Sequence, residues 1–161
     1  DMNLALTANA EAVHTQFKIN KKVATEATPY VVFFEIVGEQ VDATWTLAPE
    51  KDSVTPENFV QTVWTPLVDR LQTEYAKKPA YVVVEVVYTN SEGNFASQPV
   101  LFKWCPESGV PVRAKMMIGS SYQAFKNKVN MLDKTAELSL FSQLDINAFA
   151  EMLKLKSWVN Q

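Results

Sequence analysis

The stretch that decides the fold is "LFKWCPESGVPVRAKMMIGSSYQAFKNKV", residues 101–129. An apolar strand pattern ends at Trp104, a loop with proline and glycine follows, and residues 112–129 have the spacing of a helix. Successive side chains of a helix point about 100° apart, so Met116 and Met117 cannot both face one core. One of these two methionines must therefore point outward.

A helical wheel of residues 112–129 separates an apolar side from an outer side. The apolar side consists of Ala114, Met117, Ile118, Ser121, Phe125 and Val129. The outer side consists of Arg113, Met116, Gly119, Ser120, Gln123 and Asn127, flanked by Lys115 and Lys126. Glycine costs roughly 1 kcal/mol relative to alanine inside a helix, so folding alone gives no reason for Gly119. Close approach of a second molecule would give one.

The charge of this segment differs from that of the whole chain. Residues 112–129 contain four basic residues and no acidic one, whereas the chain has a formal net charge of −3. An acidic chain argues against broad nucleic-acid binding. Single exposed methionines and solvated charged faces are ordinary. A methionine, a glycine, two serines and four cations together favour a helix that docks into an apolar groove on an acidic partner.

The segments before this helix predict a helix, two strands, a second helix and two more strands. Thr7 can cap a helix whose buried face is Ala10, Val13 and Phe17. Residues 30–37 and 40–47 predict a hairpin around Gly38-Glu39, with Val41, Ala43, Trp45 and Leu47 on one face of the second strand. Pro66 predicts the start of the next helix, whose buried side is Leu67, Val68, Leu71 and Tyr75. Residues 80–88 are almost wholly apolar, as in a central strand, and residues 99–104 follow as its partner.

The segments after the basic helix predict a strand over residues 134–141 and a last helix capped by Asp145. The inner face of that helix is Ile146, Phe149, Ala150 and Leu153. The complete order predicts an α/β (α+β) fold with a single mixed, mainly antiparallel five-stranded sheet and helices on both faces. A chain of 161 residues, 47% of them hydrophobic, fits one domain over residues 1–161.

Composition excludes several kinds of chemistry. Cys105 is the single cysteine, which rules out an internal disulfide and a four-cysteine zinc site and favours a reducing, cytoplasmic setting. His14 is the single histidine, and we expect it to be solvated on a polar face of the first helix. No apolar run approaches the roughly 18 residues of a membrane span. No nucleotide-binding glycine motif is present. We therefore expect a soluble, monomeric protein that is not an enzyme and has no metal or cofactor.

The pattern from Leu101 onward resembles the actin-depolymerising factor/cofilin family, whose fold is the ADF-homology (gelsolin-like) architecture. In that family a strand ends in Trp, "xPExxPxxxKM" follows, and a helix continues with a Ser-Ser pair and several lysines. The matching positions are Trp104, Pro106, Glu107, Lys115, Met116, Ser120 and Ser121. The resemblance covers nearly the whole chain in its order of elements and about thirty residues as a specific motif.

This resemblance implies actin binding by insertion of helix 112–129 into the cleft between the two outer-facing subdomains of actin. The residues that match the family's contacts are Arg113, Lys115, Met116, Ser120 and Ser121. Gly119, Gln123 and Asn127 join them from the outer side of the wheel, and Leu4 and Leu6 from the N-terminal segment that packs alongside. The expected partner is actin, as monomers and also filaments, in the cytoskeleton, with filament disassembly as the outcome.

The chain departs from the family pattern at several positions. Tyr122 and Gln123 stand where many members carry a basic and an acidic residue. On the second, filament-specific surface Gln98 is neutral, which leaves Lys154 and Lys156 as contributors, so severing is less secure than monomer binding. The first serine is Ser53, so we expect no N-terminal phosphoserine switch. Two alternatives stay open: a non-severing protein of the coactosin or glia maturation factor type, and a module that binds phosphoinositides.

Overall fold

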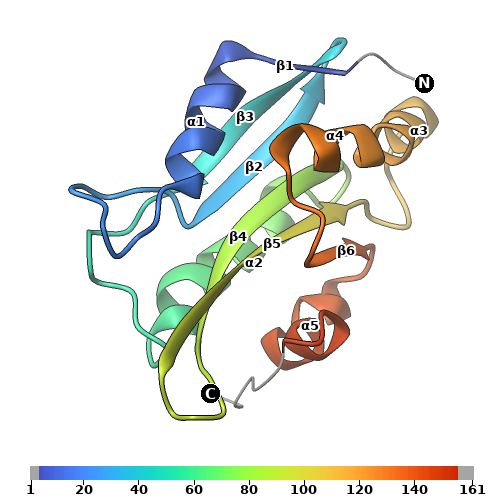
Figure 1. Cartoon of the computed structure of the whole chain (residues 1–161). Coiled ribbons are helices and arrows are strands. Elements are labelled where there is room, and N and C mark those ends of the chain that lie inside the picture. Colours follow the sequence, from blue (N-terminus) through green and yellow to red (C-terminus); the bar gives the residue numbers. More distant parts are fainter. Residues whose placement is uncertain (1–3, 156–161) are drawn as a thin grey trace.

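The computed structural model describes residues 4–155, which form one mixed sheet covered by helices on both faces (Figure 1). The strands are β1 (Ala5–Leu6), β2 (Val31–Val37), β3 (Gln40–Leu47), β4 (Ala80–Thr89), β5 (Phe95–Trp104) and β6 (Thr135–Leu138). The helices are α1 (Ala8–Lys18), the π-helix η1 (Val60–Trp64), α2 (Thr65–Glu74), α3 (Val112–Ser120), α4 (Tyr122–Val129), the 3-10 helix η2 (Phe141–Leu144) and α5 (Ile146–Met152). The predicted fold class is confirmed.

The spatial order of the strands is β1-β3-β2-β4-β5-β6. The two outer pairs, β1 with β3 and β5 with β6, are parallel, and the inner pairs are antiparallel. The described residues thus form six strands where the sequence predicted five. The additional strand is β1, in which Ala5 and Leu6 pair with Gln40 and Val41. A strand of two residues is too short to show an alternating pattern, so it could not be predicted from the sequence.

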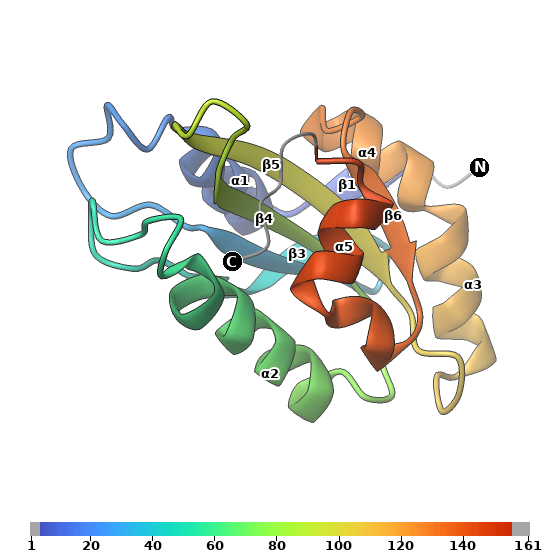
Figure 2. The same ribbon diagram turned by 90° about the horizontal axis from the view of Figure 1, so that it is seen from below.

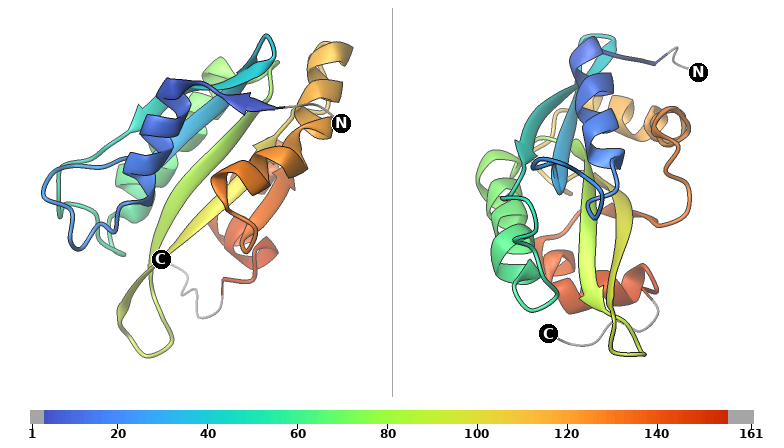
Figure 3. Two further views of the ribbon diagram at one scale, coloured as in Figure 1. Left: turned by 45° about the horizontal axis from the view of Figure 1, so that its top comes forward. Right: turned by 60° about the vertical axis from the view of Figure 1, so that its left-hand side comes forward.

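The helices divide the core into two layers. On one face of the sheet, α1, α3 and α4 cover a cluster that includes Phe34, Val83 and Phe125. On the other face, α2 and α5 cover a larger cluster that includes Phe33, Val84 and Phe149. Figure 2 shows α2 and α5 on the same side of the sheet, and the right-hand view of Figure 3 shows α1 and α2 on opposite sides. The central strand β4 is buried on both faces, as the sequence predicted.

Most of the predicted helix and strand boundaries agree with the structure. Thr7 caps α1 by accepting a hydrogen bond from the amide of Ala10 at 3.0 Å, and Asp145 caps α5 in the same way through Ala148 at 3.1 Å. Pro66 lies in the first turn of α2. Strand β5 begins earlier than predicted, at Phe95, and β6 ends earlier, at Leu138, where the chain enters η2.

A β-bulge overturns the prediction that one apolar face runs the length of β3. The register shifts between Phe33 and Phe34, which pair with Trp45 and Ala43 and leave Thr44 as the extra residue. Ala43 consequently packs with the cluster under α1, whereas Trp45 packs with the opposite cluster. Apolar and polar residues alternate without interruption through this strand. The extra residue nevertheless makes the apolar side chains of its second half face the opposite side of the sheet.

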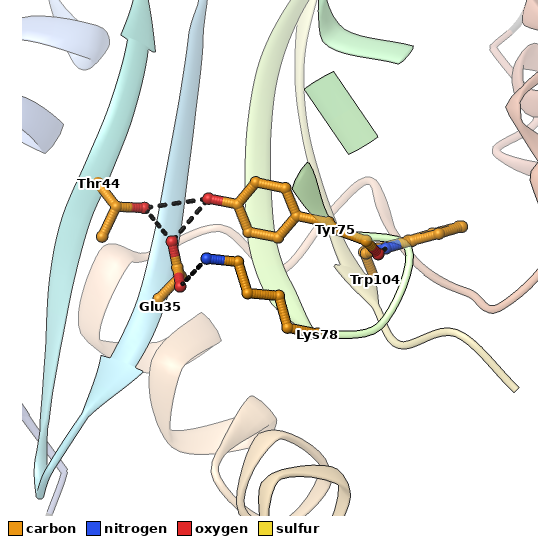
Figure 4. Close-up of polar contacts among 5 residues, drawn as sticks. All are labelled: Glu35, Thr44, Tyr75, Lys78 and Trp104. Carbon is orange, nitrogen blue, oxygen red and sulfur yellow. Dashed lines mark hydrogen bonds and ion pairs between the residues drawn. The ribbon is translucent and has the colours of Figure 1, made fainter. Parts of the chain in front are cut away.

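The bulged Thr44 belongs to a polar network that ties the sheet to the end of α2 (Figure 4). The hydroxyls of Thr44 and Tyr75 each donate to Glu35 Oε2 at 2.6 Å, and Lys78 Nζ lies 3.2 Å from Glu35 Oε1. Burial by itself raises the pKa of Glu35, but these partners outweigh burial and lower it below its ordinary value. Burial and the bond to Glu35 raise the pKa of Tyr75 to about 12. Trp104 Nε1 fixes the other side of Tyr75 by donating to its carbonyl at 2.9 Å.

The basic helix predicted over residues 112–129 is two helices that meet at Ser121 (Figure 1). The buried Tyr81 hydroxyl donates to the carbonyl of Ile118 at 2.6 Å. In an uninterrupted helix that carbonyl accepts the amide four residues later. A side chain inserted into this hydrogen-bond ladder and a Gly-Ser pair are both known causes of kinks, and Gly119-Ser120 precedes the junction.

His14 is buried, which corrects the prediction that it is solvated. Only 9% of the residue is exposed, and its Nε2 bonds the carbonyl of Val129, the last residue of α4, at 3.1 Å. Its ring packs against Phe17 and Phe34. Burial, reinforced by the charge of Lys18, lowers the pKa of His14 below its ordinary value of 6.5. The histidine therefore links α1 to the end of α4.

Candidate functional site

Helix α3 exposes two large apolar side chains. Met116 is 67% exposed and Val112 is 74% exposed, and Ile118 is the one buried residue of this helix. The outward direction predicted for Met116 is confirmed, and Met117 is turned partly inward. Val112 was missed as a surface residue, although its spacing of four from Met116 places both on one helix face. These two side chains form an exposed apolar pair.

The backbone beside Met116 is also bare. Gly119 and Ser120 are exposed, and a Cβ atom built on Gly119 would meet only Lys103 Nζ, at 3.9 Å. No part of the described chain therefore requires glycine at this position for close packing. The Ser120 hydroxyl lies 3.4 Å from the carbonyl of Met117, so it stays close to its own helix. A partner could approach the helix backbone closely here.

The cationic groups lie around this apolar pair and along α4. Arg113 and Lys115 are exposed in the first turns of α3, and Lys115 Nζ reaches the carbonyl of Glu107 at 3.3 Å. In α4, Lys126 Nζ stacks over the Tyr122 ring at 4.5 Å. The sequence segment is free of acids, but Glu137 of β6 lies nearby. Its hydrogen bond and charge attraction to Lys103 lower the pKa of Glu137 below its ordinary value.

Helix α4 is anchored to the sheet by aromatic packing. Phe125 stacks on Tyr81 at 4.5 Å between ring centroids, and Tyr122 stacks on the same ring at 5.4 Å. The Tyr122 hydroxyl donates to the carbonyl of Ala136 at 2.7 Å. Burial raises the pKa of Tyr81 and of Tyr122 above their ordinary values. Both hydroxyls therefore stay protonated and donate hydrogen bonds, Tyr81 to Ile118 and Tyr122 to Ala136. These bonds and the ring stacking hold the helix pair on the sheet.

A groove of about 460 Å³ runs between the N-terminal half of α3 and the β2–β3 hairpin. Its apolar walls are Ile36, Pro79, Pro111, Ala114, Met117 and Ile118, and its charged groups are Glu35, Lys78 and Arg113. Glu35 and Lys78 come from the network of Figure 4, which holds this wall of the groove in place. On the side of α3, the groove is lined by Met117 and not by Met116.

The structure separates the predicted contact residues into exposed and buried groups. The exposed group is Arg113, Lys115, Met116, Gly119, Ser120, Gln123 and Asn127, all on α3 or α4. Ser121 and Leu4 are buried, with 0% and 2% exposure, so neither side chain offers a docking contact in this structure. Leu6 is partly buried against the cluster under α1. The wheel had already turned Ser121 inward, against its assignment from the family pattern.

Two of the three residues predicted for a second, filament-binding surface lie within the described residues. Gln98 is partly buried in β5, and its amide donates to the carbonyl of Pro99 at 3.1 Å. Lys154 is exposed after α5, with a backbone φ of 52°. Lys156 lies outside the described residues.

The chain belongs to the family of cofilin/tropomyosin-type actin-binding proteins, whose model matches residues 43–154. This match covers the basic helix pair, the sheet from β3 onward and α5. No curated protein matches the sequence. Within residues 4–155, no helix combines the length and the apolar character that a membrane crossing needs.

Solved structures of three kinds share the fold at low sequence identity. Actin depolymerization factor 2 of Plasmodium berghei aligns with a TM-score of 0.72 and 14% identity, over 96% of this chain and 99% of its own. The human coactosin-like protein aligns with a TM-score of 0.67 and 14% identity, over 100% of this chain and 95% of its own. Glia maturation factor from Caenorhabditis elegans aligns with a TM-score of 0.61 and 12% identity, over 94% of this chain and 95% of its own. At these identities the likeness is one of fold.

Proposed function

We propose that this protein binds actin through the exposed faces of α3 and α4, and that its main partner is the actin monomer. The observation that carries the proposal is the exposure of Met116 on a helix pair, residues 112–129, that contains four cations and no acidic residue. Membership of an actin-binding family supplies the partner. An exposed methionine fills an irregular apolar pocket well, and surrounding cations steer and orient an acidic partner.

The proposed contact surface consists of Val112, Arg113, Lys115, Met116, Gly119, Ser120, Gln123 and Asn127. Exposed side chains on one helix face bind a groove at a spacing of three or four residues, which is the spacing of Val112, Met116 and Gly119. The small residues Gly119 and Ser120 allow close approach of the partner. Ser121 and Leu4 are left out because the structure buries them.

Filament disassembly is proposed as a second activity of the protein. The residues before Pro99 on β5 are neutral, so this region lacks charged side chains for a second actin subunit. We therefore place monomer binding first and filament turnover second. Imaging of single filaments separates this protein from a non-severing relative, because a severing protein increases the number of filament ends.

The experiment that tests actin binding is a titration of labelled monomeric actin, in its ADP and ATP states, with the protein and two variants. The variant R113A/K115A/M116A removes the cationic and apolar contacts together, and we expect loss of binding with thermal stability nearly unchanged. The matched control V23A/K51A/K77A removes an exposed apolar side chain and two exposed cations elsewhere, and should bind like the original protein. Absence of binding by the unmodified protein at low salt would contradict the proposal.

A second candidate is binding to phosphoinositide head groups, favoured by the four cations of residues 112–129. Basic clusters on helices attract anionic lipid surfaces at short range. Flotation with vesicles that contain or lack phosphoinositides tests this. Competition between such vesicles and actin would show that both use the same helix pair.

A further inference from the structure

A cavity of about 770 Å³ lies at the opposite end of the sheet from the exposed face of α3. It forms where β4 and β5 extend beyond both α1 and α4 toward their connecting turn (Figure 1). Its walls come from residues 17–22, Tyr30, residues 52–55, Glu85 and Val87 of β4, and residues 95–99 of β5. A cavity of roughly 300–1,000 Å³ with apolar walls and a few polar groups is typical of small-molecule sites.

Glu85 is one of two acidic residues that line the cavity; the other, Asp52, is paired with Lys51. Glu85 interrupts the apolar strand "AYVVVEVVY" and is largely buried at the cavity wall. Burial raises the pKa of Glu85, while a hydrogen bond from Ser97 and the charges of Lys21 and Lys18 act in the opposite direction. The ion pairs within residues 4–155 join Lys51 to Asp52, Lys78 to Glu35 and Lys103 to Glu137. Glu85 therefore has no cation within ion-pair distance in the described chain.

Lys21 is a basic residue that lines the cavity. Its ammonium donates to the carbonyl of Phe17 at 2.8 Å and lies over the rings of Phe17 and Tyr30, 4.8 and 5.2 Å from their centroids. Burial lowers the pKa of Lys21, and the charge of Glu85 acts in the opposite direction. An ammonium has three donors, so Lys21 retains capacity for a further acceptor. The cavity thus holds opposite charges that are close enough to interact but are not paired.

We propose that this cavity binds a zwitterionic small molecule of the α-amino-acid type. The ammonium group of the ligand pairs with Glu85, and its carboxylate pairs with Lys21, with Lys18 and Lys22 at the opening favouring the anionic end. A ligand with one charge would leave either Glu85 or Lys21 without an opposite charge at the cavity wall, where both side chains are partly buried. The apolar side chain of the ligand packs against Val87, Phe95 and Pro99.

Three probes of similar shape should bind the cavity with different affinities. L-Phenylalanine carries both charges, phenethylamine lacks the carboxylate, and 3-phenylpropionate lacks the ammonium. In calorimetric titrations of the full chain, we expect L-phenylalanine to bind at least tenfold more tightly than either analogue. Binding of phenethylamine or 3-phenylpropionate as tight as that of L-phenylalanine would overturn the proposal, as would no binding of L-phenylalanine at millimolar concentration.

Two variants assign the charges. E85Q removes the anion and should weaken L-phenylalanine binding at least tenfold while leaving 3-phenylpropionate unaffected. K21M keeps an apolar stem over the aromatic rings and should weaken L-phenylalanine while leaving phenethylamine unaffected. E151Q changes an exposed carboxylate on α5 and serves as the matched control. Unchanged L-phenylalanine affinity in either cavity variant would overturn the assignment, and the three-probe comparison tests the site even if a variant fails to fold.

Discussion

Helices α3 and α4 are neighbours of nearly equal length, yet they relate to the core in different ways. Helix α4 buries Tyr122, Phe125 and Val129, whereas α3 buries Ile118 alone and exposes Val112 and Met116. The left-hand view of Figure 3 shows the two helices meeting at an angle. We infer that α4 attaches the helix pair to the core and that α3 provides the exposed surface.

The largest expected effect comes from removing the anchor. The variant F125A leaves a cavity among Phe34, Tyr81 and the rest of the cluster under α1, and should lower the free energy of unfolding by about 3–5 kcal/mol. The variant M116A removes an exposed side chain of α3 and should change stability by less than about 0.5 kcal/mol. Urea unfolding followed by tryptophan fluorescence measures both values.

Actin binding should show the reverse order of effects. At a temperature where F125A is still folded, we expect it to retain actin binding, while M116A loses affinity. If M116A instead lost stability as F125A does, Met116 would belong to the core and the contrast between the two helices would be wrong.

The next effect concerns the junction between the helices. The variant Y81F removes the hydroxyl that donates to the Ile118 carbonyl and leaves that buried acceptor without this donor. We expect a loss of about 1–3 kcal/mol in thermal unfolding, because an unsatisfied buried polar group costs this much. Amide exchange should rise in α3 more than in α4, since aromatic packing still holds α4. Equal increases in both helices would show that the hydroxyl has no special role at the junction.

A pH-dependent effect tests the far end of α4, where His14 bonds Val129. Because burial lowers the pKa of His14 in the folded state, the unfolded chain takes up a proton first as the pH falls below 6.5. The free energy of unfolding should therefore decrease below pH 6.5, by about 1.4 kcal/mol for each unit by which the pKa is lowered. Unfolding curves at pH 7.5, 6.0 and 5.0 for the original protein and H14Q measure this. A decrease of the same size in H14Q would assign it to other groups.

Local patterns in the sequence predicted much of the fold and of the candidate surface. The outward direction of Met116, the caps at Thr7 and Asp145 and the central strand each follow from neighbours within a few residues. The exposure of the outer-side residues of α3 and α4 is confirmed, and their contact with actin stays a prediction. Val112 could have been included, because its distance of four residues from Met116 was visible in the sequence.

Features that depend on distant residues could not be predicted in this way. The burial of His14 depends on the end of α4, 115 residues later in the chain. At the break near Ser121, Gly119-Ser120 is a local signal, but the hydrogen bond from the Tyr81 hydroxyl of β4 is not visible in the local sequence. The turned-over half of β3 depends on pairing with β2, since alternation continues through Trp45 without any sign of a bulge. The charges of Glu85 and Lys21 meet at one cavity only after the sheet and the segment after α1 are in place.

A small gain in stability at Gly119 separates the requirements of folding from those of binding. In G119A, the new methyl group meets only Lys103 Nζ at 3.9 Å, and alanine is the better helix former. We expect a gain of about 0.4–1 kcal/mol in unfolding free energy together with weaker actin binding, because the methyl group occupies the space left for close approach. Denaturant unfolding and actin titration on the same sample measure the two effects. If G119A became more stable and bound actin equally well, the exposed backbone at Gly119 would have no part in docking. The proposed contact surface on α3 would then depend on Met116, Arg113 and Lys115.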